Sequence, residues 1–485
     1  MVFSSHLFLF YFLPVVLLLN YALPFRWLSF MLVASNLVFY GWASPVWVGL
    51  LLFSASVDYV CGRLLVRLSG LPDVDGEPPL LPPGTPRTPG QKAVLAVSMV
   101  SNLGLLAFFK YYDFGAANLN ALAALGGVAV PLVPVLHLAL PAGISFYTFQ
   151  SMSYGIDVYR GEARALRRPV DFLCFVSLFP HLVAGPIIRY ATLAGQLRSR
   201  RFTWEQFARG VAFFSLGMGK KILLANPLGH VADRAFGAAA LSAVDGWTGL
   251  VAYAFQIYFD FSAYSDMAVG LGLMLGFLLV RNFDDPYKAD SITDFWRRWH
   301  ISLSTWLRDY LYIPLGGNRV SLPRTYANLL IVMVLGGLWH GASWTFVVWG
   351  TLHGAMLALE RGQGKDSLYR RLPRPARVAV TFAVACVGWV FFRADSIGAA
   401  GTYLRSLAGL AAVPPGASLA AGAMYTPYHL LVLAVAAVFV WGAPQAWQYT
   451  QRLTPMRAAV CLAVLGVSVL LMWTQTVNPF LYYQF

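Results

Sequence analysis

The chain reads Asp294-Phe-Trp-Arg-Arg-Trp-His300-Ile-Ser-Leu-Ser-Thr-Trp306 and, after an apolar run, Gly336-Gly-Leu-Trp-His340-Gly-Ala-Ser-Trp344. Each stretch sets one histidine among tryptophans, and the run between them is apolar enough to lie in lipid. Polar side chains at membrane depth are costly and usually have a function. Proton transfer is the most economical explanation for a histidine in such a place. His300 and His340 are therefore the first candidates for a functional site.

The composition assigns the chain to the polytopic membrane proteins. Of its 485 residues, 58% are hydrophobic and only 12% are charged, whereas a soluble protein has about 25% charged residues. Because about 20 apolar residues span a bilayer, the sequence predicts roughly eleven to thirteen transmembrane or re-entrant helices. We therefore expect an all-α fold in which residues 1–485 form one membrane domain.

The expected helices are apolar stretches separated by polar, Gly-rich or Pro-rich breaks. They cover 7–23, 27–42, 46–65, 93–109, 116–140, 143–158, 172–188, 207–224, 248–279, 326–348, 352–360, 376–392, 430–441 and 457–473. Several are short or interrupted by Gly and Pro, which favours tilted, kinked or re-entrant pieces buried in protein. The first is expected to be a retained helix with its N-terminus outside, because no Lys or Arg precedes Arg26.

Two loops interrupt this pattern. Residues 69–91 are rich in Pro and Gly and predict a mobile surface loop, whereas 361–377 carries six Lys or Arg against Asp366 and predicts a basic cytoplasmic loop. Core motifs lie at 143–360, and residues 378–485 predict C-terminal helices. The net charge of +14 fits a positive-inside topology, and part of it can attract an anionic substrate. No basic tract is long enough to indicate nucleic acid.

Residues 294–312 predict an amphipathic helix that lies in the membrane interface. Aromatic and leucine side chains recur there at helical spacing, and Arg297 and Arg298 fall on the other side. His300 shares the apolar face and should point inward, although a histidine beside two arginines can also simply be solvated. Arg319 follows Gly316-Gly317-Asn318, a flexible setting in which a cation can touch a phosphate.

His340 is flanked by glycines that permit close backbone approach or a local break in the helix. It predicts a general base that faces a cavity and takes a proton from an accepting hydroxyl or thiol. The alternative is a structural histidine bonded to a neighbouring helix. His353, thirteen residues further on, could face the same cavity, but taken alone it indicates a structural role.

Polar residues also interrupt the apolar helix expected at 248–279. Gln256, Asp260, Ser262 and Asp266 are spaced so that pairs of them share one helix face. Carboxylates in such a helix need a wet cavity or a partner, so they predict either the wall of a polar tunnel or a packing network between helices. The chain lacks a P-loop, an HExxH motif and a Gly-x-Ser-x-Gly motif. Its four separated cysteines predict buried fillers, and no metal site is expected.

Several motifs together resemble those of one family. They are Ile144-Ser-Phe-Tyr-Thr-Phe149, Asp157-Val-Tyr-Arg-Gly161, Phe179-Pro-His-Leu-Val-Ala-Gly-Pro-Ile187, Tyr258-Phe-Asp-Phe-Ser-Ala-Tyr-Ser-Asp266, and the stretches at 294–319 and 336–344. In these residues the chain is similar to the membrane-bound O-acyltransferase (MBOAT) family, and within it to the bacterial branch of alginate O-acetyltransferase subunits. The likeness runs from Met1 to about Phe392.

The resemblance implies an all-helical membrane domain around a central tunnel, multi-pass in the bacterial inner membrane. His340 would be the catalytic histidine, and His300 would occupy a second, more variable position that assists it. The tunnel would be lined by Gln256, Asp260, Ser262, Asp266, Trp299 and Trp339, and the acyl donor would contact Arg297, Arg298 and Arg319. That donor would be cytoplasmic acetyl-CoA, with no bound cofactor. A periplasmic acetyltransferase partner would complete transfer to an exported polysaccharide.

Two other classes of protein stay open on the sequence. A transporter or flippase for a polysaccharide precursor would also have intramembrane carboxylates and a basic cytoplasmic face. It predicts internal helix repeats, which the sequence does not display. A non-catalytic scaffold of a periplasmic acetyltransferase complex predicts that both histidines can be replaced without loss, and polar residues buried at a cost argue against it. The sequence therefore favours a membrane-bound O-acetyltransferase.

Overall fold

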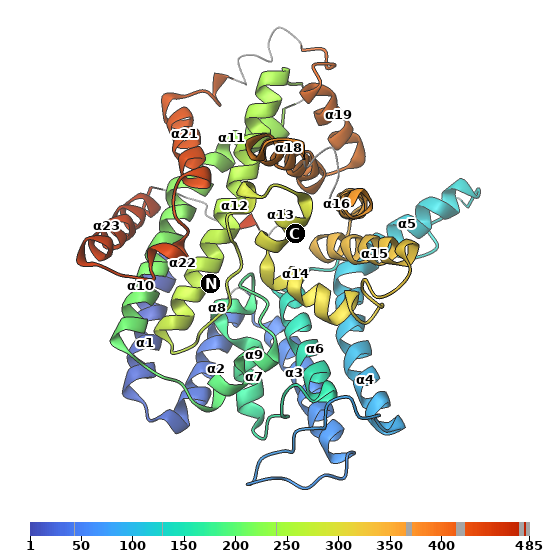
Figure 1. Ribbon diagram of the computed structural model, residues 1–485, viewed down its shortest axis with the longest axis vertical. Helices are drawn as coiled ribbons and strands as arrows, with labels where there is room; N and C mark the ends of the chain where they lie inside the picture. The colour runs from blue at the N-terminus through green and yellow to red at the C-terminus, as the bar shows by residue number, and fades with distance from the viewer. Residues whose placement is uncertain are drawn as a thin grey trace. The chain divides into compact units, whose positions relative to one another are not determined.

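The computed structural model describes residues 1–42, 44–128, 130–238, 240–364, 371–413, 422–474 and 480–481. Every regular element in those ranges is a helix, which confirms the all-α prediction (Figure 1). The chain divides into two compact units, Met1–Gly210 with Leu271–Leu279, and Val211–Gly270 with Val280–Phe485. One continuous domain over the whole chain stays a prediction.

The first unit is built from the N-terminal helices. Its elements are η1 (Phe8–Phe12), α1 (Leu13–Ala22), α2 (Phe25–Gly41), α3 (Val46–Arg67), α4 (Pro89–Leu106), η2 (Ala107–Tyr111), α5 (Tyr112–Leu125), α6 (Ile144–Arg160), α7 (Pro169–Ser177), α8 (Phe179–Leu182) and α9 (Tyr190–Arg198). α4 begins where Thr88 and Gln91 each accept a hydrogen bond from the other's backbone N–H. This reciprocal cap explains why a helix starts directly after a Pro-rich loop.

The second unit holds the elements that carry the site. They are η3 (Lys220–Ala225), α11 (Asn226–Phe236), most of α12 (Ala243–Met274), η4 (Pro286–Lys288), α13 (Ile292–Arg298), α14 (Ile301–Leu307), η5 (Arg308–Tyr312), α15 (Leu322–His340), α16 (Trp344–Gln363), α18 (Arg374–Arg393), α19 (Ile397–Leu407), α21 (Pro427–Trp441), α22 (Ala446–Tyr449) and α23 (Pro455–Met472). α10 (Trp204–Gly219) leads from the first unit into the second.

Within the described residues, five helices are long and apolar enough to cross a membrane: Val46–Arg67, Pro89–Leu125, Leu322–His340, Arg374–Arg393 and Pro455–Met472. Phe8–Ala22 and Pro427–Trp441 are shorter apolar helices. The span predicted at 172–188 is divided between α7 and α8, which is the kind of broken piece that is tolerated when it is buried in protein.

The span predicted at 116–140 is wrong. α4, η2 and α5 form one helix of 37 residues, Pro89–Leu125. It ends before Gly127, whose φ of 87° is left-handed, and the prolines that follow prevent a new helical turn. The chain then returns beside α5, because the backbone N–H groups of Leu136 and Leu138 donate to the Asp113 carboxylate at 2.7 and 2.8 Å.

Both predicted loops connect helices. Residues 69–91 are mostly exposed up to the start of α4, as expected of a surface loop, and their mobility stays a prediction. Glu77 pairs with Arg198 at 3.0 Å, and Arg167 donates to the Gly76 carbonyl at 2.8 Å. The basic loop at 361–377 joins α16 to α18, and its residues 365–370 lie outside the described residues.

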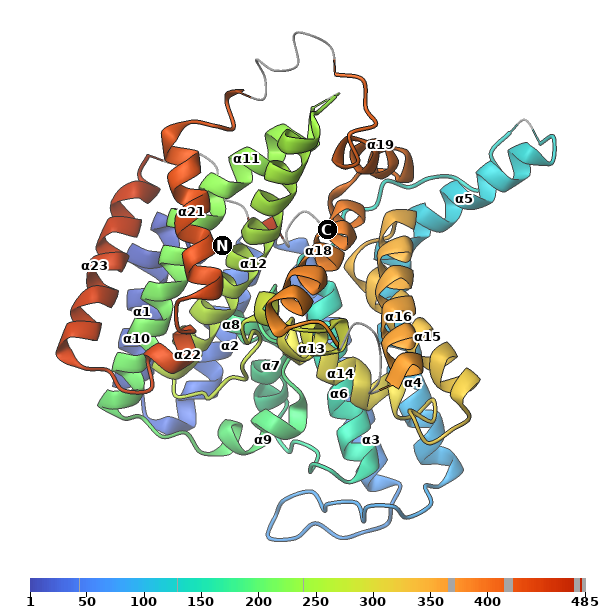
Figure 2. The ribbon, with the colours of Figure 1, turned by 45° about the horizontal axis from the view of Figure 1, so that its top comes forward.

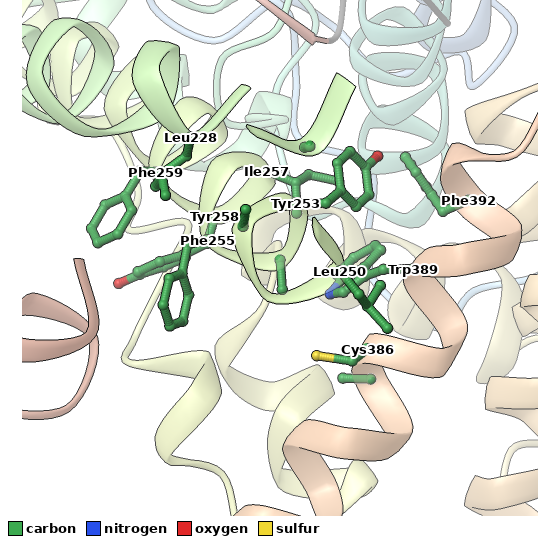
Figure 3. Close-up of a cluster of buried hydrophobic side chains, with 14 of the residues drawn as sticks. Leu228, Leu250, Tyr253, Phe255, Ile257, Tyr258, Phe259, Cys386, Trp389 and Phe392 are labelled. Carbon is green, nitrogen blue, oxygen red and sulfur yellow. The ribbon is translucent and has the colours of Figure 1, made fainter. Parts of the chain in front are cut away.

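The core of the second unit is a continuous cluster of aromatic and aliphatic side chains contributed chiefly by α11, α12, α18 and α21. Figure 3 shows part of it, with Tyr253 and Phe255 of α12 and Trp389 of α18 among its buried members. Cys386 belongs to the same cluster, and all four cysteines are buried free thiols. The prediction that the cysteines are buried fillers is confirmed.

α15 and α16 form a close helical hairpin, visible side by side in Figure 2. Glycines make this approach possible, because a Cβ on Gly337 would lie 2.3 Å from the Phe346 carbonyl oxygen. A Cβ on Gly350 would likewise lie 2.4 Å from the carbonyl oxygen of Met333. No real Cβ is found so close to backbone, so the hairpin requires glycine at both positions.

Replacing Gly337 by Ala is therefore expected to destabilise the hairpin by about 1–3 kcal/mol or more, the usual cost of forcing extra atoms into a packed interior. The measurement is the melting temperature of the protein in detergent. Gly336→Ala is a matched control one residue away, where the added Cβ would meet only Leu307 Cδ1 at 3.4 Å. Equal melting temperatures for the two variants would contradict this account of the hairpin.

Candidate active site

His340 is the last residue of α15, so the span predicted at 326–348 is wrong in its extent. The helix stops because Gly341 is extended, and Ser343 then caps α16 by accepting the Thr345 N–H at 3.3 Å. His340 is 4% exposed. Its ring meets Trp349 and Phe392 edge-on, with centroids 5.3 and 5.1 Å away. The side chain is thus held among aromatic rings at a helix end.

The single amphipathic helix predicted at 294–312 is also wrong. The segment is α13, a break at Trp299 and His300, α14, and the π-helical η5. His300 has a φ of 44°, which is uncommon for a residue other than Gly and often marks a functional site. Backbone groups at the break form hydrogen bonds with an earlier segment. The Ile301 N–H donates to the Asn282 carbonyl at 2.9 Å, and the Arg298 carbonyl accepts from the Asp284 N–H at 2.9 Å.

His300 is fully buried, and its inward placement is confirmed. Its Nδ1 lies 3.2 Å from Asn282 Oδ1, and its ring packs edge-on against Phe261 at 4.6 Å. The ring centroids of His300 and His340 are 6.3 Å apart. Burial lowers the pKa of His300 to about 3, because the charged imidazolium is disfavoured away from water. His300 is therefore a neutral imidazole at physiological pH.

A cavity of about 500 Å³ adjoins His340. Apolar side chains from α13, α14, α15 and α16 form most of its wall, among them Trp296, Met333 and Trp349. Its polar lining residues are Thr293, Arg297, Ser304, Thr305, Arg308, Tyr312 and His340. This size suits a small ligand or one arm of a larger one, and the arrangement sets a titratable group and two cations around an apolar space.

The cavity lining includes one of the predicted aromatic and cationic residues and leaves out the others. Arg297 lines it, whereas Trp299, Trp339, Arg298 and Arg319 are not among its lining residues. Trp339 instead packs beside His300, at 6.0 Å between ring centroids. Trp299 is 1% exposed and stacks on Phe295 at 5.6 Å. Trp299 thus belongs to the hydrophobic core.

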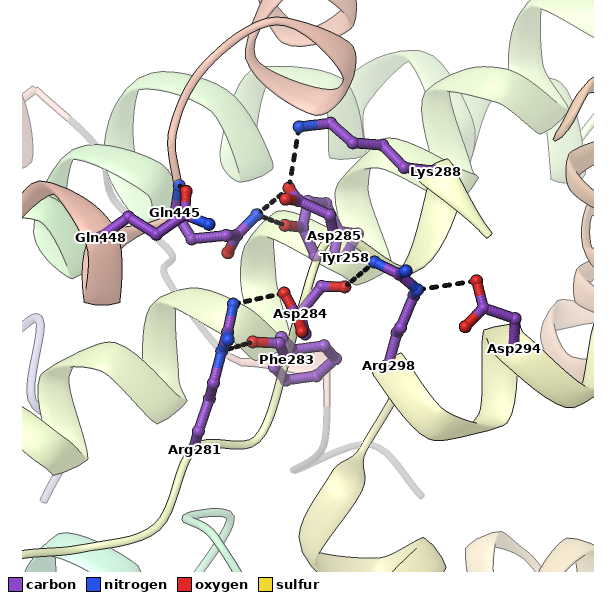
Figure 4. Close-up of polar contacts among 10 residues, drawn as sticks. All are labelled: Tyr258, Arg281, Phe283, Asp284, Asp285, Lys288, Asp294, Arg298, Gln445 and Gln448. Atoms are coloured by element: carbon purple, nitrogen blue, oxygen red, sulfur yellow. Dashed lines mark hydrogen bonds and ion pairs between the residues drawn. The ribbon is translucent and has the colours of Figure 1, made fainter. Parts of the chain in front are cut away.

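Arg298 is held in a polar network next to the break (Figure 4). It pairs with Asp294 at 2.8 Å and donates to the Asp284 carbonyl at 3.3 Å. The same network ties Asp285 to Lys288 and Gln445. Arg298 is therefore committed to holding the loop before α13, and Arg319 lies exposed in the turn after η5.

The four predicted polar residues of α12 do not line this cavity, and the two carboxylates among them form ion pairs. Asp260 pairs with Lys221 at 2.6 Å, and Asp266 pairs with Lys220 at 2.7 Å. Gln256 and Ser262 are buried on the same helix. Of the two alternatives that the sequence left open, a packing network between helices accounts for both carboxylates. Their place in a tunnel stays a prediction.

His353 lies behind the cavity wall. Its Nδ1 accepts a hydrogen bond from Trp296 Nε1 at 3.3 Å, and its ring packs against Trp349 at 5.0 Å. Sequence reasoning gave no site role to Asn282, Arg308 or Trp349. Trp349 and Arg308 carried a usable signal, since both lie close in sequence to the two histidine motifs, but Asn282 is an isolated loop residue without one.

Comparisons with known proteins find relatives of this chain. Residues 161–392 match the sequence model of MBOAT, the membrane-bound O-acyltransferase family. The probable alginate O-acetylase AlgI of Azotobacter vinelandii is 47% identical over 397 residues, which are 82% of this chain and 76% of that protein. The peptidoglycan O-acetyltransferase of Helicobacter pylori is 35% identical over 445 residues, covering 84% and 80%. The teichoic acid D-alanyltransferase of Streptococcus thermophilus is 30% identical over 232 residues, covering 45% and 56%.

Proposed function

The chain belongs to the membrane-bound O-acyltransferase family, and on that premise we propose that it transfers acetyl from cytoplasmic acetyl-CoA, through the inner membrane, for O-acetylation of an exported polysaccharide. It is a membrane enzyme of acyl transfer, as its named O-acetyltransferase relatives are. The acceptor is alginate or a similar glycan, because alginate is the polymer named for relatives at 44% to 47% identity.

The observation that carries the proposal is His340 on the wall of a largely apolar cavity. His340 acts as general base on the accepting hydroxyl. As the O–H proton passes to the imidazole, the hydroxyl oxygen attacks the thioester carbonyl carbon. The C–S bond then breaks, and the CoA thiolate leaves and takes up the proton. A thioester is already activated, so positioning and one proton transfer suffice for the reaction.

The polar side of the cavity carries positive charge that suits the phosphates of acetyl-CoA. Arg297 and Arg308 line it, and guanidinium groups bind phosphate well. Arg308 is also paired with Asp309 at 2.6 Å, which leaves Arg297 as the better contact for a CoA phosphate. The basic loop at 361–377 faces the cytoplasm under the positive-inside rule. A periplasmic acetyltransferase partner then completes transfer to the polysaccharide.

Acetyl transfer tests this function directly. The protein is reconstituted in proteoliposomes and given acetyl-CoA carrying a radiolabelled acetyl group, and release of CoA and the fate of the label are measured. Label that leaves CoA supports the proposal, and its appearance on an added glycan is expected only when the periplasmic partner is also present. Movement of glycan across the bilayer without loss of acetyl from CoA would instead establish a transporter.

Arg297→Gln is expected to raise KM for acetyl-CoA about tenfold and to change kcat little, since a hydrogen bond to a charged group contributes roughly 1.5–3 kcal/mol. Initial rates over a range of acetyl-CoA concentrations give KM and kcat separately. Arg319→Gln is the control, because Arg319 is exposed and lies outside the cavity lining. It distinguishes a direct contact of Arg297 with acetyl-CoA from a general attraction between positive charge on the protein and the anionic donor. An equal rise in KM for both variants would argue against a specific role of Arg297.

A further inference from the structure

Asn282 connects the loop before η4 to the break that carries His300. It is 2% exposed, and its Oδ1 lies 3.2 Å from Ser302 N, 2.9 Å from Ser302 Oγ and 3.2 Å from His300 Nδ1. Its Nδ2 donates to Ser265 Oγ of α12 at 3.0 Å. The amide is therefore held on both sides by groups from separate parts of the second unit.

The backbone of Ser302 determines which way this amide faces. A backbone N–H only donates, so the Asn282 atom that it meets must be the carbonyl oxygen. Turning the amide over would set its NH2 group against the Ser302 N–H and leave two donors facing each other. The same oxygen is the atom that faces His300 Nδ1.

The orientation of Asn282 in turn decides the tautomer of His300. An amide oxygen only accepts, so Nδ1 of His300 must carry the proton. A neutral imidazole has a single N–H, and the buried position of His300 keeps it neutral. Nε2 is consequently the nitrogen that accepts a proton or a hydrogen bond.

We propose that Asn282 is a positioning residue, which holds His300 in the Nδ1–H tautomer so that Nε2 serves as the hydrogen-bond acceptor beside His340. This rests on the function proposed above. The two rings are 6.3 Å apart between centroids, a separation that one bridging water spans. His300 stays neutral and accepts a hydrogen bond at Nε2 through that water, which stabilises the imidazolium that forms on His340 when it takes the hydroxyl proton.

Three variants test this assignment. Asn282→Leu removes the acceptor and is expected to lower kcat about ten- to a hundredfold, part of the contribution that a positioned proton-transfer group makes, with KM little changed. Asn282→Asp keeps an oxygen opposite Nδ1 and should restore kcat at alkaline pH. Ser302→Ala is the comparison variant, because it removes another donor to the same oxygen together with the longer 3.5 Å contact of Ser302 Oγ to His300 Nδ1. It leaves the 3.2 Å contact between Asn282 and His300 in place.

The pH profile separates positioning from a merely structural role. A carboxylate beside His300 favours the imidazolium, so the acidic limb of the Asn282→Asp profile should move to higher pH than in the wild type. Among the contacts of His300 described above, His340 is the other group that titrates, and all variants share it. Equal losses for the Leu and Asp variants at every pH would overturn the proposal.

¹⁵N NMR identifies the tautomer of His300 and does not depend on enzymatic activity. In protein labelled with ¹⁵N-histidine, the His300 signals, identified by their loss in His300→Asn, should show a protonated Nδ1 and a non-protonated Nε2. Asn282→Leu should lose this pattern, and Ser302→Ala should keep it. A protonated Nε2 in the wild type overturns the inference whatever the enzyme's activity. Absence of acetyl transfer in the wild type would overturn the proposed function instead.

Discussion

Replacing His340 by Ala is expected to lower acetyl transfer by about 10²–10⁴-fold, the usual contribution of a positioned general base, while the protein still inserts and accumulates. The imidazole ends α15 and adjoins the cavity, so its loss removes the proposed general base. The surrounding rings of Trp349 and Phe392 stay in place. Binding of acetyl-CoA should therefore persist, because the apolar wall and Arg297 are unchanged.

The measurement compares initial rates of label transfer for the wild type and His340→Ala at equal amounts of folded protein. His340→Gln adds a side chain of similar size that cannot act as a base, and it should be as inactive as the Ala variant. His137→Asn is the control, since His137 is exposed and Asn tolerates its φ of 51°. Normal acetyl transfer by His340→Ala would contradict general-base catalysis by His340.

Replacing Lys221 by Met is expected to lower the free energy of unfolding by about 3–5 kcal/mol, the cost of leaving one member of a buried ion pair without its partner. The side chains of Lys221 and Asp260 are each 3% exposed and lie 2.6 Å apart. Asp260 also accepts the Leu481 N–H at 2.7 Å. The carboxylate cannot reach water when Lys221 is lost, so the charge stays uncompensated.

Thermal unfolding in detergent measures this effect, and the double variant Lys221→Met with Asp260→Asn provides its control. The double variant removes both charges and keeps an acceptor for Leu481, so most of the lost stability should return. The neighbouring pair gives a graded comparison, because the Lys220 side chain is 16% exposed and Lys220→Met should cost less. A double variant as unstable as Lys221→Met alone would show that the charge itself is not the cause.

Residue patterns predicted the burial of the two histidines better than the backbone around them. The end of α15 at His340 was left open by the sequence, which predicted a span over 326–348. The inward placement of His300 follows from its local sequence. The break at His300 does not, because it depends on backbone and side-chain groups of Asn282, which comes from an earlier loop. Periodicity within 294–312 contains no information about that partner.

Two other differences have equally physical reasons. The apolar composition of 116–140 predicts a span, but glycine and proline chemistry after Leu125 overrides hydropathy. The carboxylates of α12 suggested a tunnel as readily as a packing network, since the sequence of one helix does not show which residues of other helices pair with it. Lys220 and Lys221 in the apolar stretch 207–224 were a usable signal, because opposite charges at membrane depth tend to pair.

The helix from Pro89 to Leu125 has a consequence for the lipid around the enzyme. Its 37 residues measure roughly 55 Å at 1.5 Å per residue, whereas the hydrocarbon layer is about 30 Å thick. A helix of this length either tilts within the hydrocarbon layer or extends beyond it. The hydrocarbon thickness of the host membrane then affects how much of this helix lies outside the layer.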